Sequence, residues 1–227
     1  MTTRAIIIAA GEATRWNNYL NTPKHLISIE GEILLERTVR LLIQNNIKDI
    51  FVVGPDDDRY KVEGSKLYVP TKNLNYADAD KFLNSESLWN TEGRTLVLYG
   101  DVYFSDNCIE QVVNYTNTDW TLFCRFTESC CTGSVGGECF VQSFYPNDID
   151  RHKENLLYIA KLSNEGILRR CGGWEHFRAM NGVTGSNLNK KKYRFNNAVV
   201  IDDWTEDFDY PADYDMWIEN RKKANSK

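Results

Sequence analysis

The residues best suited to chemistry stand near the start of the chain. An uncharged apolar run, residues 5–10, ends in the small residues of loop 9–11 (Ala-Ala-Gly), and Arg15 and Lys24 follow. Small side chains let a backbone turn sharply and approach a ligand closely. Loop amides can then bind phosphate oxygens while Arg and Lys neutralise the charge. The pattern predicts a triphosphate site; the alternative is a β-loop-α connection whose cations face solvent.

Acidic residues follow two other segments. Asp101 follows the apolar run 95–99 after a single glycine, and open α/β folds bind ligands at the carboxyl ends of such strands. A carboxylate in that place needs a partner, and a divalent cation is the most useful one. The alternative is that Asp101 caps the helix starting near Asn107. Near the C-terminus, alternation places Asp207 and Asp209 on one side of an extended segment.

The elements that must position these residues alternate between strand and helix patterns. Residues 32–46 carry apolar side chains at helical spacing and lead into a buried strand at 49–54. With the first strand they complete a βαβ unit, which favours parallel pairing and an α/β fold. Further helices are predicted over 77–91, 107–115, 149–164 and 174–181, and further strands over 66–69, 95–99, 120–126 and 193–201.

Three motifs carry a resemblance to a known family. Residues 9–15 read AAGEATR, 23–26 read PKHL and 31–35 read GEILL. They resemble the signature of the sugar-phosphate nucleotidyltransferases and the shorter phosphocholine-type cytidylyltransferases. Ala13 stands where that signature has a second glycine and Ile33 where it has proline. The resemblance implies a Rossmann-like three-layer sandwich with a mixed, mostly parallel sheet, of the nucleotide-diphospho-sugar transferase type.

The resemblance also implies roles for particular residues. Mg²⁺ would be held by Asp101 and Asp209, with Asp207 assisting, and Arg15 and Lys24 would be the catalytic cations. A lysine of the 190–192 run would contact the acceptor's phosphate, although such a run is more often a solvated turn. The nucleotide-binding residues implied are Ala9, Ala10, Gly11, Glu12, Ala13, Thr14, Arg15, Asn73, Ser87 and Gly100, and the acceptor-phosphate candidates are Lys190, Lys191 and Lys192.

The predicted reaction joins an NTP to a phosphorylated small molecule and releases pyrophosphate. The substrate's own phosphate oxygen is the nucleophile, so no general base is required, and catalysis rests on positioning and charge neutralisation. The Ser-Leu-Trp element at 87–89 favours CTP, with UTP or dTTP as alternatives, and a phosphocholine-like acceptor. Sugar-1-phosphate nucleotidyl transfer, a metal-dependent glycosyltransferase and a silent nucleotide-binding domain stay open.

Length and composition bound these hypotheses. The chain has 227 residues, 42% of them hydrophobic, and a net charge of -5. We predict one domain, 1–227, within which residues 127–190 form an acceptor-binding insertion. The charge argues against nucleic-acid partners, and no apolar run approaches the roughly 20 residues of a membrane-spanning helix. We expect a cytoplasmic protein with reduced cysteines and no signal peptide; homodimerisation is left open.

Overall fold

The protein is described here by a computed structural model that covers residues 2–11, 14–71, 78–191 and 193–226. Four of the residues singled out from the sequence, Glu12, Ala13, Asn73 and Lys192, lie outside these ranges. Within the described residues, none of the helices has the length and apolar character needed to cross a membrane.

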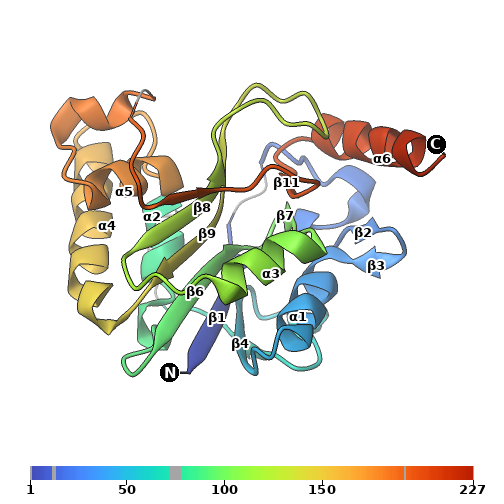
Figure 1. Cartoon of the computed structure of the whole chain (residues 1–227), viewed down its shortest axis with the longest axis horizontal. Helices are drawn as coiled ribbons and strands as arrows, with labels where there is room; N and C mark the ends of the chain where they lie inside the picture. Colours follow the sequence, from blue (N-terminus) through green and yellow to red (C-terminus); the bar gives the residue numbers. More distant parts are fainter. Residues whose placement is uncertain (1, 12–13, 72–77, 192, 227) are drawn as a thin grey trace.

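A seven-stranded sheet forms the centre of the fold, in the order β10-β8-β9-β6-β1-β4-β5 (Figure 1). Its strands are β1 (Thr3–Ile8), β4 (Asp49–Val53), β5 (Lys66–Tyr68), β6 (Arg94–Tyr99), β8 (Thr121–Arg125), β9 (Glu138–Phe144) and β10 (Ala198–Val200). β1 pairs in parallel with both β4 and β6. Only β9 runs against its neighbours β6 and β8. The predicted Rossmann-like, mixed and mostly parallel sheet is confirmed.

Helices cover both faces of this sheet, as Figure 1 shows. The helices are α1 (Leu34–Gln44), α2 (Asp78–Leu83), α3 (Asp106–Asn114), α4 (Ile149–Asn164), α5 (Gly173–Met180) and α6 (Pro211–Asn225). Alternate residues of β1 enter different cores: Ala5 and Ile7 pack in the cluster that contains α1 and α3, and Ile6 and Ile8 in the cluster of α2, α4 and α5. Because both faces are covered, the strand is apolar at every position from Ala5 to Ile8 rather than at every second one.

Residues 127–190 contribute to the central sheet. β9 lies within this range and fills the place between β6 and β8, and α4 and α5 cover one face of the sheet. β8 and β9 form a hairpin, and Asn220 of α6 donates a hydrogen bond of 2.7 Å to the carbonyl of Cys131 in its connecting loop. Figure 1 shows this loop reaching α6. The segment is therefore integral to the fold, while its role in binding an acceptor stays a prediction.

Two predicted elements are shorter than expected. The helix predicted over 77–91 ends at Leu83, where Ser85 donates a hydrogen bond to the carbonyl of Phe82, and a short 3-10 helix follows over Glu86–Leu88. Serine competes for backbone groups in this way and interrupts helices. The strand predicted over 193–201 is limited to β10, the part that pairs with β8.

A third core cluster holds the elements around the carboxyl end of the sheet. It joins the first loop, the small hairpin of β2 (Ser28–Ile29) and β3 (Glu32–Ile33), and the antiparallel pair of β7 (Val102–Tyr103) and β11 (Glu206–Asp207) to α6. Its buried members are Trp16, Ile27, Ile29, Leu34, Tyr103, Cys131, Phe208 and Trp217.

Candidate active site

A cavity of about 160 Å³ opens beyond the carboxyl ends of β1 and β6. Segments from the whole length of the chain line it, including both predicted cations and three aspartates. The lining residues are Ile8, Ala10, Gly11, Thr14, Arg15, Trp16, Lys24, His25, Lys81, Phe82, Tyr99, Asp101, Gly172, Gly173, Asp207 and Asp209. The structure thus brings together most of those residues indicated by the sequence that lie within the described ranges.

The first loop leaves β1 with a conformation that needs glycine. Gly11 has φ of 137°, which L side chains rarely adopt. A Cβ atom added there would lie 2.6 Å from Cε of Lys81. Trp16, which is buried, donates from Nε1 to the carbonyls of Tyr19 and Thr22, at 3.1 and 2.9 Å, and so fixes the loop after Arg15.

The two cations contact the acidic side of the cavity. Lys24 Nζ forms an ion pair with Asp101 and lies 3.5 Å from Asp209 Oδ1, and Arg15 forms an ion pair with Asp209. Burial alone would lower the pKa of Lys24, but the charges of Asp101, Asp207 and Asp209 raise it above its usual value. Lys24 therefore stays charged at neutral pH.

The three aspartates meet because of the pairing between β7 and β11. Asp207 lies opposite Val102 in the register, and the amide of Phe208 donates a hydrogen bond of 3.2 Å to the carbonyl of Asp101. One carboxylate oxygen from each of Asp101, Asp207 and Asp209 lies within 4.8 Å of the others. Two distant parts of the sequence thus form one carboxylate cluster.

The surroundings shift the pKa values of Asp101 and Asp207 in opposite directions. Burial would raise the pKa of Asp101, but Lys24 and its neighbours hold it at about 2, so this carboxylate is ionised. Burial, together with the charges of Asp101 and Asp209, raises the pKa of Asp207 well above its usual value. Oδ1 of Asp207 is buried and has no hydrogen-bond partner among the described residues. Such an oxygen is costly unless a ligand or a proton satisfies it.

These observations fit a hard divalent cation. Mg²⁺ prefers carboxylate oxygens and keeps open positions for phosphate oxygens and water. The three aspartates would hold it, and the orphaned oxygen of Asp207 is the kind of group a bound cation satisfies. Among the described residues this is the one group of three or more acidic, histidine or cysteine side chains close enough to share an ion.

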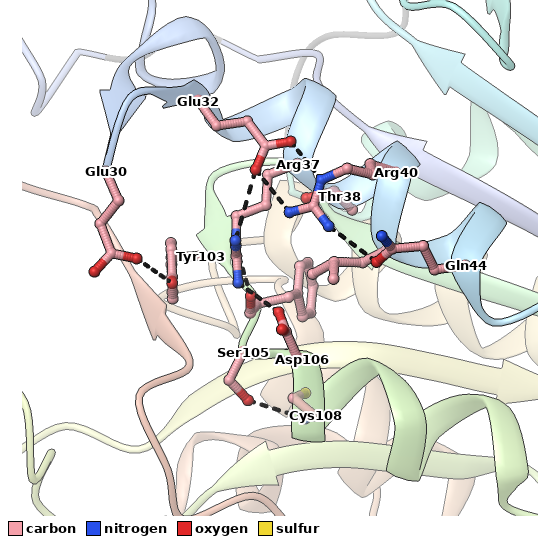
Figure 2. A network of polar contacts seen from close by, with 12 residues as sticks. Glu30, Glu32, Arg37, Thr38, Arg40, Gln44, Tyr103, Ser105, Asp106 and Cys108 are labelled. Atoms are coloured by element: carbon pink, nitrogen blue, oxygen red, sulfur yellow. Dashed lines mark hydrogen bonds and ion pairs between the residues drawn. The ribbon is translucent and has the colours of Figure 1, made fainter.

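A network of polar contacts surrounds Tyr103 of β7 (Figure 2). Arg37 of α1 contacts Asp106 at 2.6 Å and lies over the ring of Tyr103, 4.6 Å from its centroid. The hydroxyl of Tyr103 donates to Glu30 at 3.1 Å, and Glu30 also accepts from Arg221 of α6 at 2.9 Å. The network links the β2–β3 hairpin and α6 to β7, the strand that directly follows Asp101 in the chain.

Other predicted residues lie beside the cavity rather than in its wall. Ala9 lines an adjoining hollow that shares Ala10 and Gly11 with it. Gly100 lies where β6 ends against β1: its amide donates to Ile8 at 2.9 Å, and an added Cβ would lie 2.7 Å from the carbonyl oxygen of Ile8. Glycine is therefore required there by packing.

Ser87 and the lysines are further away. Ser87 donates to the hydroxyl of Tyr68 at 3.1 Å and lines a separate hollow, which has Pro70 in common with the one beside Ala9. Lys190 donates to Asn187 at 2.5 Å, and Lys191 lies exposed in the following turn. Neither lysine lines the cavity, so their contact with an acceptor's phosphate stays a prediction.

The sequence did not indicate several lining residues. Lys81 and Phe82 come from α2, Tyr99 from the end of β6, and Gly172 and Gly173 from the start of α5. The position of Tyr99 two residues before Asp101 and the Gly-Gly pair were signals available in the sequence. Lys81 carried none, because a lysine on a helix is ordinarily a solvated side chain.

Several solved structures share this fold. One is a CTP:phosphocholine cytidylyltransferase from Streptococcus pneumoniae, 18% identical, with a TM-score of 0.60 over 96% of this chain and 99% of that one. Another is a UDP-glucose pyrophosphorylase, 11% identical, with a TM-score of 0.62 over 100% and 99%. At such identities the likeness establishes the fold, which is that of the nucleotidyltransferase class.

The family model of the MobA-like NTP transferase domain matches residues 5–124, more than half of the chain. The protein belongs to this family and is a nucleotidyltransferase. No curated protein matches the chain. The matched range includes the first loop, Lys24 and Asp101, and it ends within β8, before Asp207 and Asp209.

Proposed function

We propose that the protein is a Mg²⁺-dependent cytidylyltransferase, which joins CTP to a phosphorylated alcohol of the phosphocholine type and releases pyrophosphate. The observation that carries the proposal is the convergence of three aspartates with Arg15 and Lys24 in one cavity. Carboxylates suit a divalent cation, and the two cations suit a triphosphate. The fold shared with a CTP:phosphocholine cytidylyltransferase supports this choice of substrates.

The residues of the chain then have distinct tasks. The backbone of loop 9–11 approaches the phosphates, since Gly11 leaves no side chain between them. Arg15 and Lys24 neutralise the charge that develops on the departing pyrophosphate. Asp101, Asp207 and Asp209 hold the Mg²⁺, which supplies charge stabilisation and orientation when bound.

The acceptor's phosphate oxygen attacks the α-phosphorus, forming one P–O bond as the bond to pyrophosphate breaks. That oxygen is already ionised at neutral pH, so no proton has to be removed. In agreement, His25, the histidine in the cavity wall, has its pKa lowered to about 4 by burial and is not suited to act as a base at pH 7.

A sugar 1-phosphate is the second candidate acceptor, because a UDP-glucose pyrophosphorylase shares the fold over the whole chain. Glycosyl transfer is disfavoured by the family to which the chain belongs.

Pyrophosphate release tests the proposal. The four NTPs should be crossed, with Mg²⁺, against phosphocholine, phosphoethanolamine, glycerol phosphate and several sugar 1-phosphates. Release with CTP and one of the first three supports the proposal, and release only with a sugar 1-phosphate establishes the second candidate. Absence of release across the whole grid would contradict both.

A further inference from the structure

The ion pairs in the cavity join groups that the proposed function assigns to two different ligands. Arg15 and Lys24, assigned to the triphosphate, are paired with Asp209 and Asp101, which are assigned to the metal. We propose that these ion pairs act as a charge latch. Without ligands, the cations and the carboxylates neutralise each other. A bound metal frees Arg15 and Lys24 for the triphosphate, and a bound triphosphate frees Asp101 and Asp209 for the metal. The inference rests on the proposed function and concerns how its ligands are admitted.

Burial makes the latch effective. The side chains of Lys24, Asp101 and Asp209 are 11%, 19% and 24% exposed. A metal that takes Asp101 leaves the Lys24 ammonium without its partner in a place shielded from water. Breaking a buried pair by occupying one member is strongly unfavourable, since the other charge stays uncompensated. A triphosphate supplies that compensation.

The same argument holds in the other direction. A triphosphate that takes Arg15 and Lys24 leaves Asp101 and Asp209 facing each other and Asp207, with oxygens of all three within 4.8 Å. Like charges so close repel unless a cation is shared between them. Each ligand therefore raises the affinity of the other, and by linkage the two effects are equal; such couplings typically amount to about 5–150-fold.

Chelation alone would not produce the effect that distinguishes the latch. Divalent cations bind NTPs in solution, so simple cooperativity between the two ligands is not a test. The latch instead predicts that removing a cationic side chain raises the affinity for the metal when no nucleotide is present. It predicts equally that removing a carboxylate raises the affinity for a polyphosphate when no metal is present.

The first experiment measures Mn²⁺ binding without nucleotide, by electron paramagnetic resonance of the unbound ion at pH 8. Lys24→Met keeps the aliphatic chain and removes the charge, and we expect it to bind Mn²⁺ about tenfold more tightly than the unaltered protein. Arg15→Met, whose parent side chain is 46% exposed, provides a second variant should Lys24→Met fail to fold. Lys61→Met is the matched control, because Lys61 pairs at 2.6 Å with the exposed Asp58.

The mirror experiment measures tripolyphosphate binding in EDTA by calorimetry. Asp209→Asn should bind it about tenfold more tightly than the unaltered protein, and Asp58→Asn should not differ. Unchanged or weaker Mn²⁺ binding by folded Lys24→Met or Arg15→Met overturns the latch, as does unchanged tripolyphosphate binding by Asp209→Asn.

These outcomes are independent of the substrates. Neither probe contains a base or an acceptor, so a gain in affinity without pyrophosphate release in the substrate grid would leave the latch standing and remove the proposed function. Pyrophosphate release with no gain in affinity would do the reverse.

Discussion

The part of the chain that the family model matches, residues 5–124, and the part that follows it supply the cavity in different ways. The first part delivers Lys24 and Asp101 from segments next to β1 and β6, neighbouring parallel strands. The second part delivers Asp207 on β11, a two-residue strand outside the central sheet that pairs with β7, and Asp209 two residues further on, before α6. Two of the three aspartates of the cluster therefore depend on packing between elements that lie far apart in the sequence.

A buried ion pair between Arg125 in β8 and Glu206 in β11 ties β11, which carries Asp207, to the central sheet. Both side chains are 2% exposed and lie 2.7 Å apart. Arg125→Met leaves the buried Glu206 carboxylate without its cation, and we expect a loss of about 3–5 kcal/mol in the free energy of unfolding, measured in urea. Lys161→Met, which removes an exposed pair of 3.9 Å, should cost about 0.5 kcal/mol or less.

A double variant sharpens this result. Arg125→Met with Glu206→Leu removes both charges and should recover much of the lost stability, since apolar residues replace buried pairs well. If the single variant were as stable as the unaltered protein, the pairing with β7 and the hydrogen bonds of Ser129 and Thr132 to Glu206 would suffice to hold β11.

Asp101 and Asp209 come from the two different parts and should be equally necessary for turnover. We expect Asp101→Ala to lower kcat at least about 100-fold, because it removes a charge that organises the phosphates. That loss corresponds to about 2.7 kcal/mol. Asp209→Ala should lose a similar factor in the pyrophosphate assay, and the exposed Asp58→Ala should lose none.

Both variants should keep their thermal unfolding midpoint within a few degrees. An unchanged rate in folded Asp101→Ala would remove the metal assignment, and a large loss in Asp101→Ala alone would confine the essential acid to the family-matched part.

Glu138, at the start of β9, should make the stability of the fold depend on pH. Burial, followed by the charges of Asp209, Glu206 and Asp101, raises its pKa to about 7, although Arg125 opposes the shift. A carboxyl whose pKa is higher in the folded state than its ordinary 4.5 makes the fold lose stability as pH rises from about 4.5 to 7. Glu138→Gln should remove this loss and be more stable at pH 8 by on the order of 2 kcal/mol.

Urea unfolding at pH 5 and pH 8 in metal-free buffer measures the effect, with Glu165→Gln, an exposed acid at the end of α4, as control. Equal stability of Glu138→Gln and the unaltered protein at both pH values would show that Glu138 is ionised without cost.

Ser105 should produce the smallest effect. Its hydroxyl accepts from the amide of Cys108 at 2.9 Å, as the N-cap of α3, and donates to Asp203 at 2.6 Å in the segment before β11. Ser105→Ala should cost about 1 kcal/mol, the typical value of a lost N-cap. Ser105→Thr keeps the cap and should cost less, and a result in which both lose the same amount would contradict the role of the hydroxyl.

Much of the fold could be predicted because its signals are local. The uniform apolar character of residues 5–8 indicated burial on both faces, and the helical spacing of residues 32–46 indicated α1, which runs over Leu34–Gln44. The helix predicted over 149–164 coincides with α4. The one predicted to end near Trp89 stops at Leu83, because a hydrogen bond from Ser85 outweighed the propensity of the residues around it.

The candidate site, like the fold, could be predicted only in part from the sequence. The sequence by itself determined the small-residue loop, the two cations and the aspartate after β6, since each follows a strand whose pattern is readable from neighbouring residues. Alternation also placed Asp207 and Asp209 on one side of their segment. Only the tertiary structure decided that this segment pairs with β7, that Lys81 and Gly173 reach the same cavity, and that Ser87 and Lys190 do not line it. The physical reason is that local periodicity fixes which face of an element is buried, whereas contacts between residues 100 apart depend on how several elements pack at once.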